Sequence, residues 1–103
     1  RDYIHVMDLA DAHLAALKFL SHNKPQIIPI NIGTGHGTSV KEIVDKFMEI
    51  NKVSIPYRYV KRRKGDTAYL VADNSRSLEL LKWIPKRNIS EMCADTWRWA
   101  GNF

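Results

Sequence analysis

The sequence predicts an α/β or mixed α+β fold, because segments with helical spacing of apolar residues alternate with short apolar and β-branched segments. We expect four helices and three or four strands in 103 residues, a length that allows one domain or part of one. Hydrophobic residues make up 45% and charged residues 26%, which excludes disordered and fibrous proteins. These strands are too few for a sheet covered on both faces, and the first residue is not methionine, so we expect a fragment of a longer protein.

The first predicted elements are a strand, a helix and a second strand. Residues 2–6 favour a strand, and Asp8 is expected to cap a helix whose apolar face repeats at three- and four-residue steps through residues 9–20. Residues 27–32 form a nearly continuous apolar run, which is typical of a strand buried on both faces. Pro29 cannot donate a hydrogen bond to a neighbouring strand, so this strand should lie at an edge or carry a bulge.

A glycine-rich loop and a helix follow at residues 33–39 and 40–48, with Ser39 and Glu42 in the spacing of a capping box. A strand, a glycine loop and a helix in succession can bind a dinucleotide pyrophosphate at the helix N-terminus. The fingerprint of that site requires glycine at its sixth position, which Thr38 occupies here. The loop is therefore interpreted as a structural turn that needs positive φ values.

Two further strands are expected at residues 55–60 and 68–72, on either side of a basic run. Tyr57 and Lys61 are four residues apart, and on a helix this spacing would bring the ammonium group beside the tyrosine. On a strand the two side chains are far apart, so we interpret this spacing as coincidence.

The chain is expected to end with two helices. Residues 73–75 can cap a short helix around residues 78–81, and Ser90 is expected to cap a final helix over residues 91–100. Trp97 falls on the apolar face of that final helix, so we interpret its aromatic cluster as core packing rather than as a platform for stacked bases.

Sixteen lysine and arginine residues against eleven aspartate and glutamate residues give a formal charge of +5, which favours an anionic partner such as nucleic acid, acidic lipid or a phosphorylated small molecule. The dense basic run, residues 61–64, is followed at once by Gly65 and Asp66. Arg63 can bind phosphate oxygens in a bidentate fork, Asp66 can accept hydrogen bonds from sugar hydroxyls, and Gly65 lets the backbone turn between them. The residues alone leave open whether this run is a phosphate site or a solvated loop.

Other function classes find no support in the sequence. The four histidines are scattered without the spacing of a metal site, so we expect no metal. No Gly-x-Ser-x-Gly nucleophile elbow is present, so nucleophilic hydrolysis is not supported. Cys93 is the single cysteine, which suits a reducing compartment, and we expect a cytoplasmic protein. No apolar run approaches the roughly 20 residues that cross a bilayer, so no membrane partner is expected.

Four blocks of the sequence, taken in order, resemble the C-terminal third of the UDP-glucose 4-epimerases, a family of extended short-chain dehydrogenases. The blocks are Arg1–His13, Asn31–Gly35, Arg62–Asp66 and Glu91–Trp99. Together they span nearly the whole chain. The first and third also occur in related nucleotide-sugar epimerases, including those that act on UDP-pentoses.

The resemblance implies the end of a Rossmann sheet plus the smaller mixed α/β substrate-binding domain, with residues 1–103 as the UDP-sugar-binding portion. The NAD-binding domain and the catalytic Tyr/Lys and Ser/Thr groups would lie upstream of Arg1. The chain alone is thus expected to contain no catalytic, cofactor-binding or metal-binding residues. The full-length protein would be a homodimer that interconverts UDP-galactose and UDP-glucose by NAD-dependent oxidation and reduction at sugar C4, and it would bind no nucleic acid.

The substrate-binding residues that the resemblance implies are Arg1 and Arg63 for the diphosphate, Asp66 for the ribose, and Lys64 and Gly65 in the same segment. Lys64 stands where proline or an acidic residue is expected, and it adds charge beside the phosphates. Leu70 stands where members of the family carry Tyr or Cys, and side-chain size there bears on admission of N-acetylated sugars. The sugar therefore stays open, and a UDP-pentose is an alternative.

Two alternatives come from other classes of protein. A small basic module that binds nucleic acid is suggested by the net charge and the aromatic content, and its affinity would depend steeply on salt. A non-catalytic remnant that folds or pairs with another chain is the third possibility.

Overall fold

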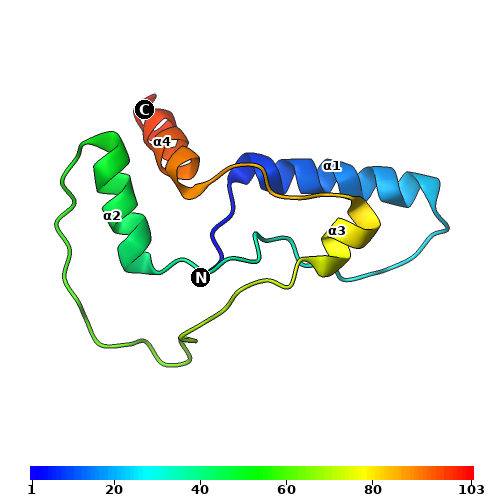
Figure 1. Cartoon of the computed structure of the whole chain (residues 1–103), viewed down its shortest axis with the longest axis horizontal. Coiled ribbons are helices and arrows are strands. Elements are labelled where there is room, and N and C mark those ends of the chain that lie inside the picture. The colour runs from blue at the N-terminus through cyan, green and yellow to red at the C-terminus, as the bar shows by residue number, and fades with distance from the viewer.

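The computed structural model describes residues 1–103 as four helices joined by extended segments (Figure 1). Helices α1 and α3 contact each other at one end of the molecule, and helices α2 and α4 pack together at the other. The radius of gyration is 16.6 Å, compared with about 13 Å for a compact domain of this length. The bounds are α1 Val6–His22, α2 Val40–Asn51, α3 Ser75–Leu81 and α4 Ile89–Ala100.

The predicted strands are absent, which corrects the sheet part of the α/β prediction. Residues 27–32, 55–60 and 68–72 follow extended paths but form no backbone ladder, and Ile27 is fully exposed. In the segment before α1, Arg1 and Thr38 exchange two backbone hydrogen bonds of 2.9 and 2.8 Å, the pattern of an antiparallel pair. An apolar, β-branched segment becomes a strand only beside a neighbour that completes its hydrogen bonds, and these segments have none.

Two of the four predicted N-caps were wrong. His5 caps α1 instead of Asp8, because its Nδ1 accepts a hydrogen bond from the backbone N–H of Met7 at 3.0 Å. Asn88 caps α4 instead of Ser90 and forms a capping box with Glu91. The predicted capping box of Ser39 and Glu42 at α2 is confirmed, with hydrogen bonds of 3.0 and 2.6 Å.

The small core lies between α1 and α3. Ala12, Leu81 and Trp83 are buried at its centre, and the Trp83 Nε1–H donates to the Asp8 carbonyl at 3.1 Å. Leu17 and Leu20 of the predicted apolar face of α1 are 64% and 46% exposed instead, because no element covers that side. Only 8 of 103 residues are buried, so many large apolar side chains stay exposed.

Helices α2 and α4 form the second contact. The rings of Phe47 and Trp97 meet edge-on with centroids 5.8 Å apart, and the Asn51 side chain donates to the Cys93 carbonyl at 3.1 Å. Cys93 is 2% exposed, and this burial raises the pKa of its thiol. Trp97 packs on Phe47 as its place on the apolar face suggests, but 48% of Trp97 and 64% of Trp99 stay exposed.

A buried carboxylate joins α1 to the segment that leads into α4. The Asp8 side chain accepts hydrogen bonds from the backbone N–H groups of Lys86 and Arg87, at 3.0 and 2.9 Å, and from the Arg87 guanidinium at 2.5 Å. Burial alone would raise the pKa of Asp8, but these hydrogen bonds and the Arg87 charge outweigh it and lower the pKa. Asp8 therefore stays ionised inside the protein.

A second carboxylate, Asp2, organises the glycine loop. Its oxygens accept hydrogen bonds from the backbone N–H groups of Thr34, Gly35 and Ala72, at 2.9, 2.9 and 3.2 Å. Burial opposes ionisation of Asp2, yet these bonds lower its pKa overall. Gly35 has a φ of +75°, which confirms the predicted structural turn.

Gly33→Ala is expected to destabilise the protein by about 1–3 kcal/mol, the usual cost of overpacking. A Cβ atom on Gly33 would lie 2.6 Å from the Cβ of Ala72 and 2.7 Å from an Asp2 oxygen. The Ala72 methyl group cannot move away by a change of rotamer, because alanine has none. The control is Gly65→Ala, where the new Cβ meets nothing within 4 Å and the cost is the strain of a φ of +79°. Urea denaturation of the full-length protein compares them, and an equal or smaller loss for Gly33→Ala would contradict the crowding argument.

Candidate functional site

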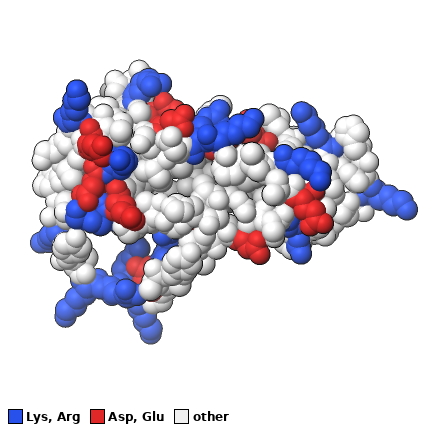
Figure 2. Space-filling model, viewed as in Figure 1, with Lys and Arg blue, Asp and Glu red and all other residues white.

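A basic groove of about 710 Å³ lies between the start of α2 and the extended segment of residues 57–68. Six cationic side chains and one carboxylate, Asp66, line it. Figure 2 shows lysine and arginine side chains gathered over the projecting loop at the lower left of the molecule. An excess of positive charge in a concave surface favours binding of an anion. The cations are Arg1, Lys41, Arg58, Lys61, Arg62 and Arg63.

Asp66 is the centre of the polar contacts in this groove. Gly65, with its positive φ, lets the chain turn so that the Asp66 N–H donates to the Arg63 carbonyl at 3.2 Å. The turn brings Arg63 Nη2 to 3.5 Å from Asp66 Oδ2, while Arg1 Nη2 lies 2.6 Å from Asp66 Oδ1. The other Arg1 nitrogen, Nη1, donates to the Thr67 carbonyl. The side chains of Arg1 and Asp66 are therefore fixed.

The Arg63 side chain is less constrained than the Arg1 side chain. The Arg63 side chain is 87% exposed, whereas the Arg1 and Asp66 side chains are 34% and 29% exposed. The 3.5 Å contact to Asp66 is at the limit of a hydrogen bond, so it does not hold the Arg63 fork in one direction. The guanidinium can rotate toward a bound anion while Arg1 stays in place.

The structure places three of the six residues proposed from the sequence in one groove: Arg1, Arg63 and Asp66. Lys64 and Gly65 form the adjacent turn but do not line the groove. Leu70 lies outside it and is 60% exposed.

Sequence reasoning missed an aromatic wall of the groove. Tyr57 and Tyr59 meet edge-on with ring centroids 6.0 Å apart, and the Lys41 ammonium lies 5.5 Å from the Tyr57 centroid. Hydrogen bonding to Asp45 raises the pKa of Lys41, so this lysine stays charged. The alternation of Tyr57 and Tyr59 in an extended segment was a signal that both rings share one face.

The charged groups that line this groove are suited to binding an anion. Tyr57 and Lys61 lie on an extended segment, not on a helix, in agreement with the interpretation of their spacing as coincidence. No group of three or more histidine, cysteine, aspartate or glutamate side chains is placed to hold a metal ion, and no helix is long and apolar enough to cross a membrane. Arginine forks beside a carboxylate and two aromatic rings suit a phosphorylated, ring-containing ligand.

Comparison with known proteins identifies relatives along nearly the whole chain, although no protein-family model matches it. UDP-glucose 4-epimerases of Schizosaccharomyces pombe and Bacillus subtilis are 44% and 46% identical to it over 99 residues. A bifunctional UDP-glucose and UDP-xylose 4-epimerase of Arabidopsis thaliana is 46% identical over 101 residues. These matches cover 96–97% of this chain but only 28–29% of each relative, so the chain spans less than a third of their length.

Solved structures give the same result. The UDP-glucose 4-epimerase of Stenotrophomonas maltophila, crystallised with NAD and formylated UDP-arabinopyranose, matches with a TM-score of 0.92 and 44% identity. That of Bifidobacterium longum, in complex with NAD+ and UDP, matches with a TM-score of 0.91 and 37% identity. Each match covers 99% of this chain and 30% of the solved chain.

In sequence and in fold, this chain is thus similar to a segment of nucleotide-sugar epimerases. More particularly, the chain is homologous to the C-terminal part of the UDP-glucose 4-epimerases. The resemblance expected from the four sequence blocks is confirmed.

Proposed function

We propose that this chain is the UDP-sugar-binding C-terminal portion of a longer UDP-glucose 4-epimerase. The longer protein interconverts UDP-galactose and UDP-glucose by NAD-dependent oxidation and reduction at sugar C4. The observation that carries the proposal is the groove in which Arg1 and Arg63 converge on Asp66. Structural neighbours with UDP and a UDP-sugar bound support it.

In this proposal Arg1 and Arg63 bind the diphosphate and Asp66 binds the ribose. Arg1 contacts Asp66 through one carboxylate oxygen and leaves the second oxygen with only the long Arg63 contact, so it can accept a hydrogen bond from a ribose hydroxyl. Arginine suits the diphosphate because its planar fork matches two phosphate oxygens. Lys64 and Gly65 shape the turn that sets Arg63 and Asp66 side by side.

The NAD site is proposed to lie in the rest of the longer protein, together with the catalytic residues. The glycine loop of this chain does not fit a dinucleotide, because the backbone N–H groups of Thr34 and Gly35 that would meet a phosphate already donate to Asp2. No reaction step is therefore assigned to residues of this chain, whose role is to bind the nucleotide.

The identity of the sugar is the finer part of the proposal. UDP-glucose and UDP-galactose are the first candidates, and the Arabidopsis relative that also acts on UDP-xylose favours a UDP-pentose as the second. A panel of UDP-hexoses, UDP-pentoses and UDP-N-acetylhexosamines separates these substrates. We further propose a cytoplasmic homodimer that binds neither nucleic acid nor membrane, on the basis of the family resemblance.

Arg63→Ala in the full-length protein tests the proposed site. We expect UDP affinity to fall about tenfold, or about 1.5 kcal/mol, at the lower end for a charged hydrogen bond because Arg63 is largely exposed. Isothermal titration calorimetry with UDP measures it. Arg98→Ala is the matched control, because Arg98 is an exposed arginine with a 3.1 Å contact to Asp95, outside the groove.

Unchanged UDP affinity in the Arg63 variant would remove this residue from the site. If the folded full-length protein does not bind UDP but binds DNA or RNA in a low-salt gel shift, the nucleic-acid-binding module is favoured instead.

A further inference from the structure

Three exposed cations line the groove without any partner. Arg58, Lys61 and Arg62 form no ion pair and no side-chain hydrogen bond, and we call them the outer cations. The other cations of the groove differ, since Arg1 and Arg63 contact Asp66 and Lys41 contacts Asp45. The proposed diphosphate contacts involve Arg1 and Arg63, which leaves the outer cations without a role.

The charge of the chain is concentrated at this groove. Its six cations and one carboxylate give a net five positive charges, which equals the formal charge of +5 for all 103 residues. The remainder of the chain is therefore electrically balanced. Such an asymmetry produces a directed field around the groove rather than a uniform basic surface.

Exposed, flexible cations add little to the strength of a bound complex, because water screens them and fixing long side chains costs entropy. They do act on a charged ligand before contact, over a distance set by the Debye length of about 10 Å at 0.1 M salt. Electrostatic complementarity of this kind raises the association rate more than it lowers the dissociation rate.

We propose that the outer cations speed the capture of the nucleotide diphosphate, while Arg1 and Arg63 hold it. This inference rests on the proposed function, since it requires the anion to bind in this groove. It assigns a kinetic role to Arg58, Lys61 and Arg62, which is separate from the contacts that determine residence time.

The test is stopped-flow binding of UDP to the full-length protein at ionic strengths from about 20 to 500 mM. The variant Arg58→Gln/Lys61→Gln/Arg62→Gln is expected to lower the association rate constant about tenfold at low salt, at the lower end of electrostatic steering effects. The dissociation rate constant should change less than about twofold, and the difference in association rate should vanish at high salt, where the charges are screened.

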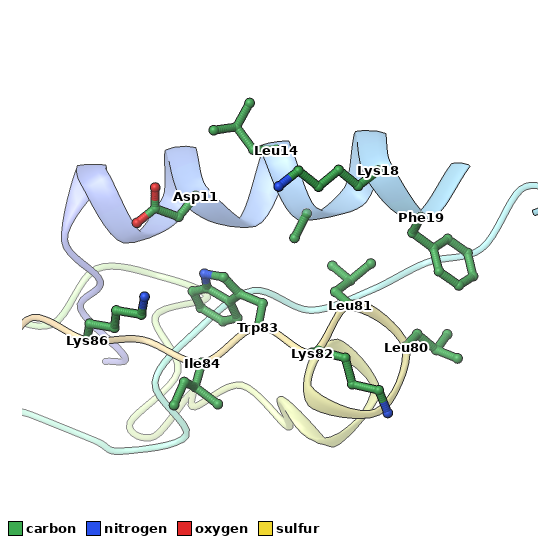
Figure 3. A pocket seen from close by; sticks show the side chains of 11 residues that line it. Asp11, Leu14, Lys18, Phe19, Leu80, Leu81, Lys82, Trp83, Ile84 and Lys86 are labelled. Carbon is green, nitrogen blue, oxygen red and sulfur yellow. The ribbon is translucent and has the colours of Figure 1, made fainter. Parts of the chain in front are cut away.

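A matched control removes the same number of charges from a separate groove. Lys18, Lys82 and Lys86 are exposed lysines that line a separate groove of about 420 Å³ between α1 and α3 (Figure 3). The variant Lys18→Gln/Lys82→Gln/Lys86→Gln changes the net charge equally. Its association rate constant should stay within about twofold of the unmodified protein at every salt concentration, because those lysines line a groove that shares no residue with the basic groove.

Equal slowing in both variants would overturn the inference, because net charge alone would then be responsible. A variant that changes only the dissociation rate constant, by raising it, would also overturn the inference. That result would place the outer cations among the direct diphosphate contacts. If the folded, unmodified protein does not bind UDP at any salt concentration, the proposed function itself fails, which is a distinguishable result.

Discussion

Asp8→Ala is expected to lower the free energy of unfolding by about 3 kcal/mol, a large change for a single substitution. Asp8 is 1% exposed and accepts hydrogen bonds from the backbone N–H groups of Lys86 and Arg87 and from the Arg87 side chain. Alanine would leave these donors without their acceptor. The loss stays at the lower end for a buried pair because Arg87 is 31% exposed and also contacts Asp11 at 3.3 Å.

Urea denaturation of the full-length protein at several pH values measures this effect. The pKa of Asp8 is lowered on folding from its ordinary value of 3.8, so its contribution is fully present above that pH and is lost as the pH falls through the folded-state pKa. The Asp8 variant should therefore lose less stability between neutral pH and acid than the unmodified protein does.

Glu49→Ala is the control for the Asp8 experiment, because it removes an exposed carboxylate that contacts Lys46 at 2.8 Å. Its expected cost is below about 1 kcal/mol. Similar losses for the two variants would show that the contacts of Asp8 carry no special stability.

Arg1→Ala is expected to weaken UDP binding by about 2–3 kcal/mol, or roughly 30- to 150-fold, which exceeds the effect of Arg63→Ala. Arg1 has two tasks in the proposed site. Its guanidinium would bind the diphosphate, and it also fixes Asp66 and the Thr67 carbonyl. Alanine therefore removes a phosphate contact and frees the carboxylate that is proposed to hold the ribose.

Arg1→Lys separates charge from geometry. Lysine keeps the positive charge but cannot contact Asp66, Thr67 and a phosphate at once in a planar fork, so UDP affinity should recover only in part. Calorimetry with UDP reports on both the diphosphate contact and the positioning of Asp66, whereas calorimetry with pyrophosphate, which has no ribose, reports on the phosphate contact alone. Full recovery by lysine, or an Arg1→Ala effect smaller than that of Arg63→Ala, would contradict the dual role.

The sequence predicted helices better than strands for a physical reason. A helix completes its hydrogen bonds within its own segment, so the local signals near residues 9–20, 40–48, 78–81 and 91–100 sufficed. A strand depends on a neighbour, and residues 27–32 have none. The errors in the caps have a similar origin, because Asp8 is used by the distant residues Lys86 and Arg87 instead of by its own helix.

The candidate site likewise combines contacts between neighbours in the sequence with contacts between distant residues, and the distant contacts are the harder ones to predict. Arg63 and Asp66 are close in the sequence, and the turn that was expected at Gly65 brings them together, but the residues alone left open whether this run is a phosphate site or a solvated loop. The contact between Arg1 and Asp66 joins residues 65 positions apart, and only the family resemblance suggested that both belong to one site. The wall formed by Tyr57 and Tyr59 was not predicted, because its place in the groove depends on the contact with Lys41 of α2, which is distant in the sequence.

Because Cys93 is buried between α2 and α4, the rate at which its thiol reacts measures the local separation of these two helices. Cys93 is the single thiol of these 103 residues and is covered by the helix pair, and the burial that raises the pKa of this thiol keeps the reactive thiolate scarce. Alkylation in the native protein must wait until α2 separates from α4. The labelling rate would therefore time that separation without any introduced dye or isotope.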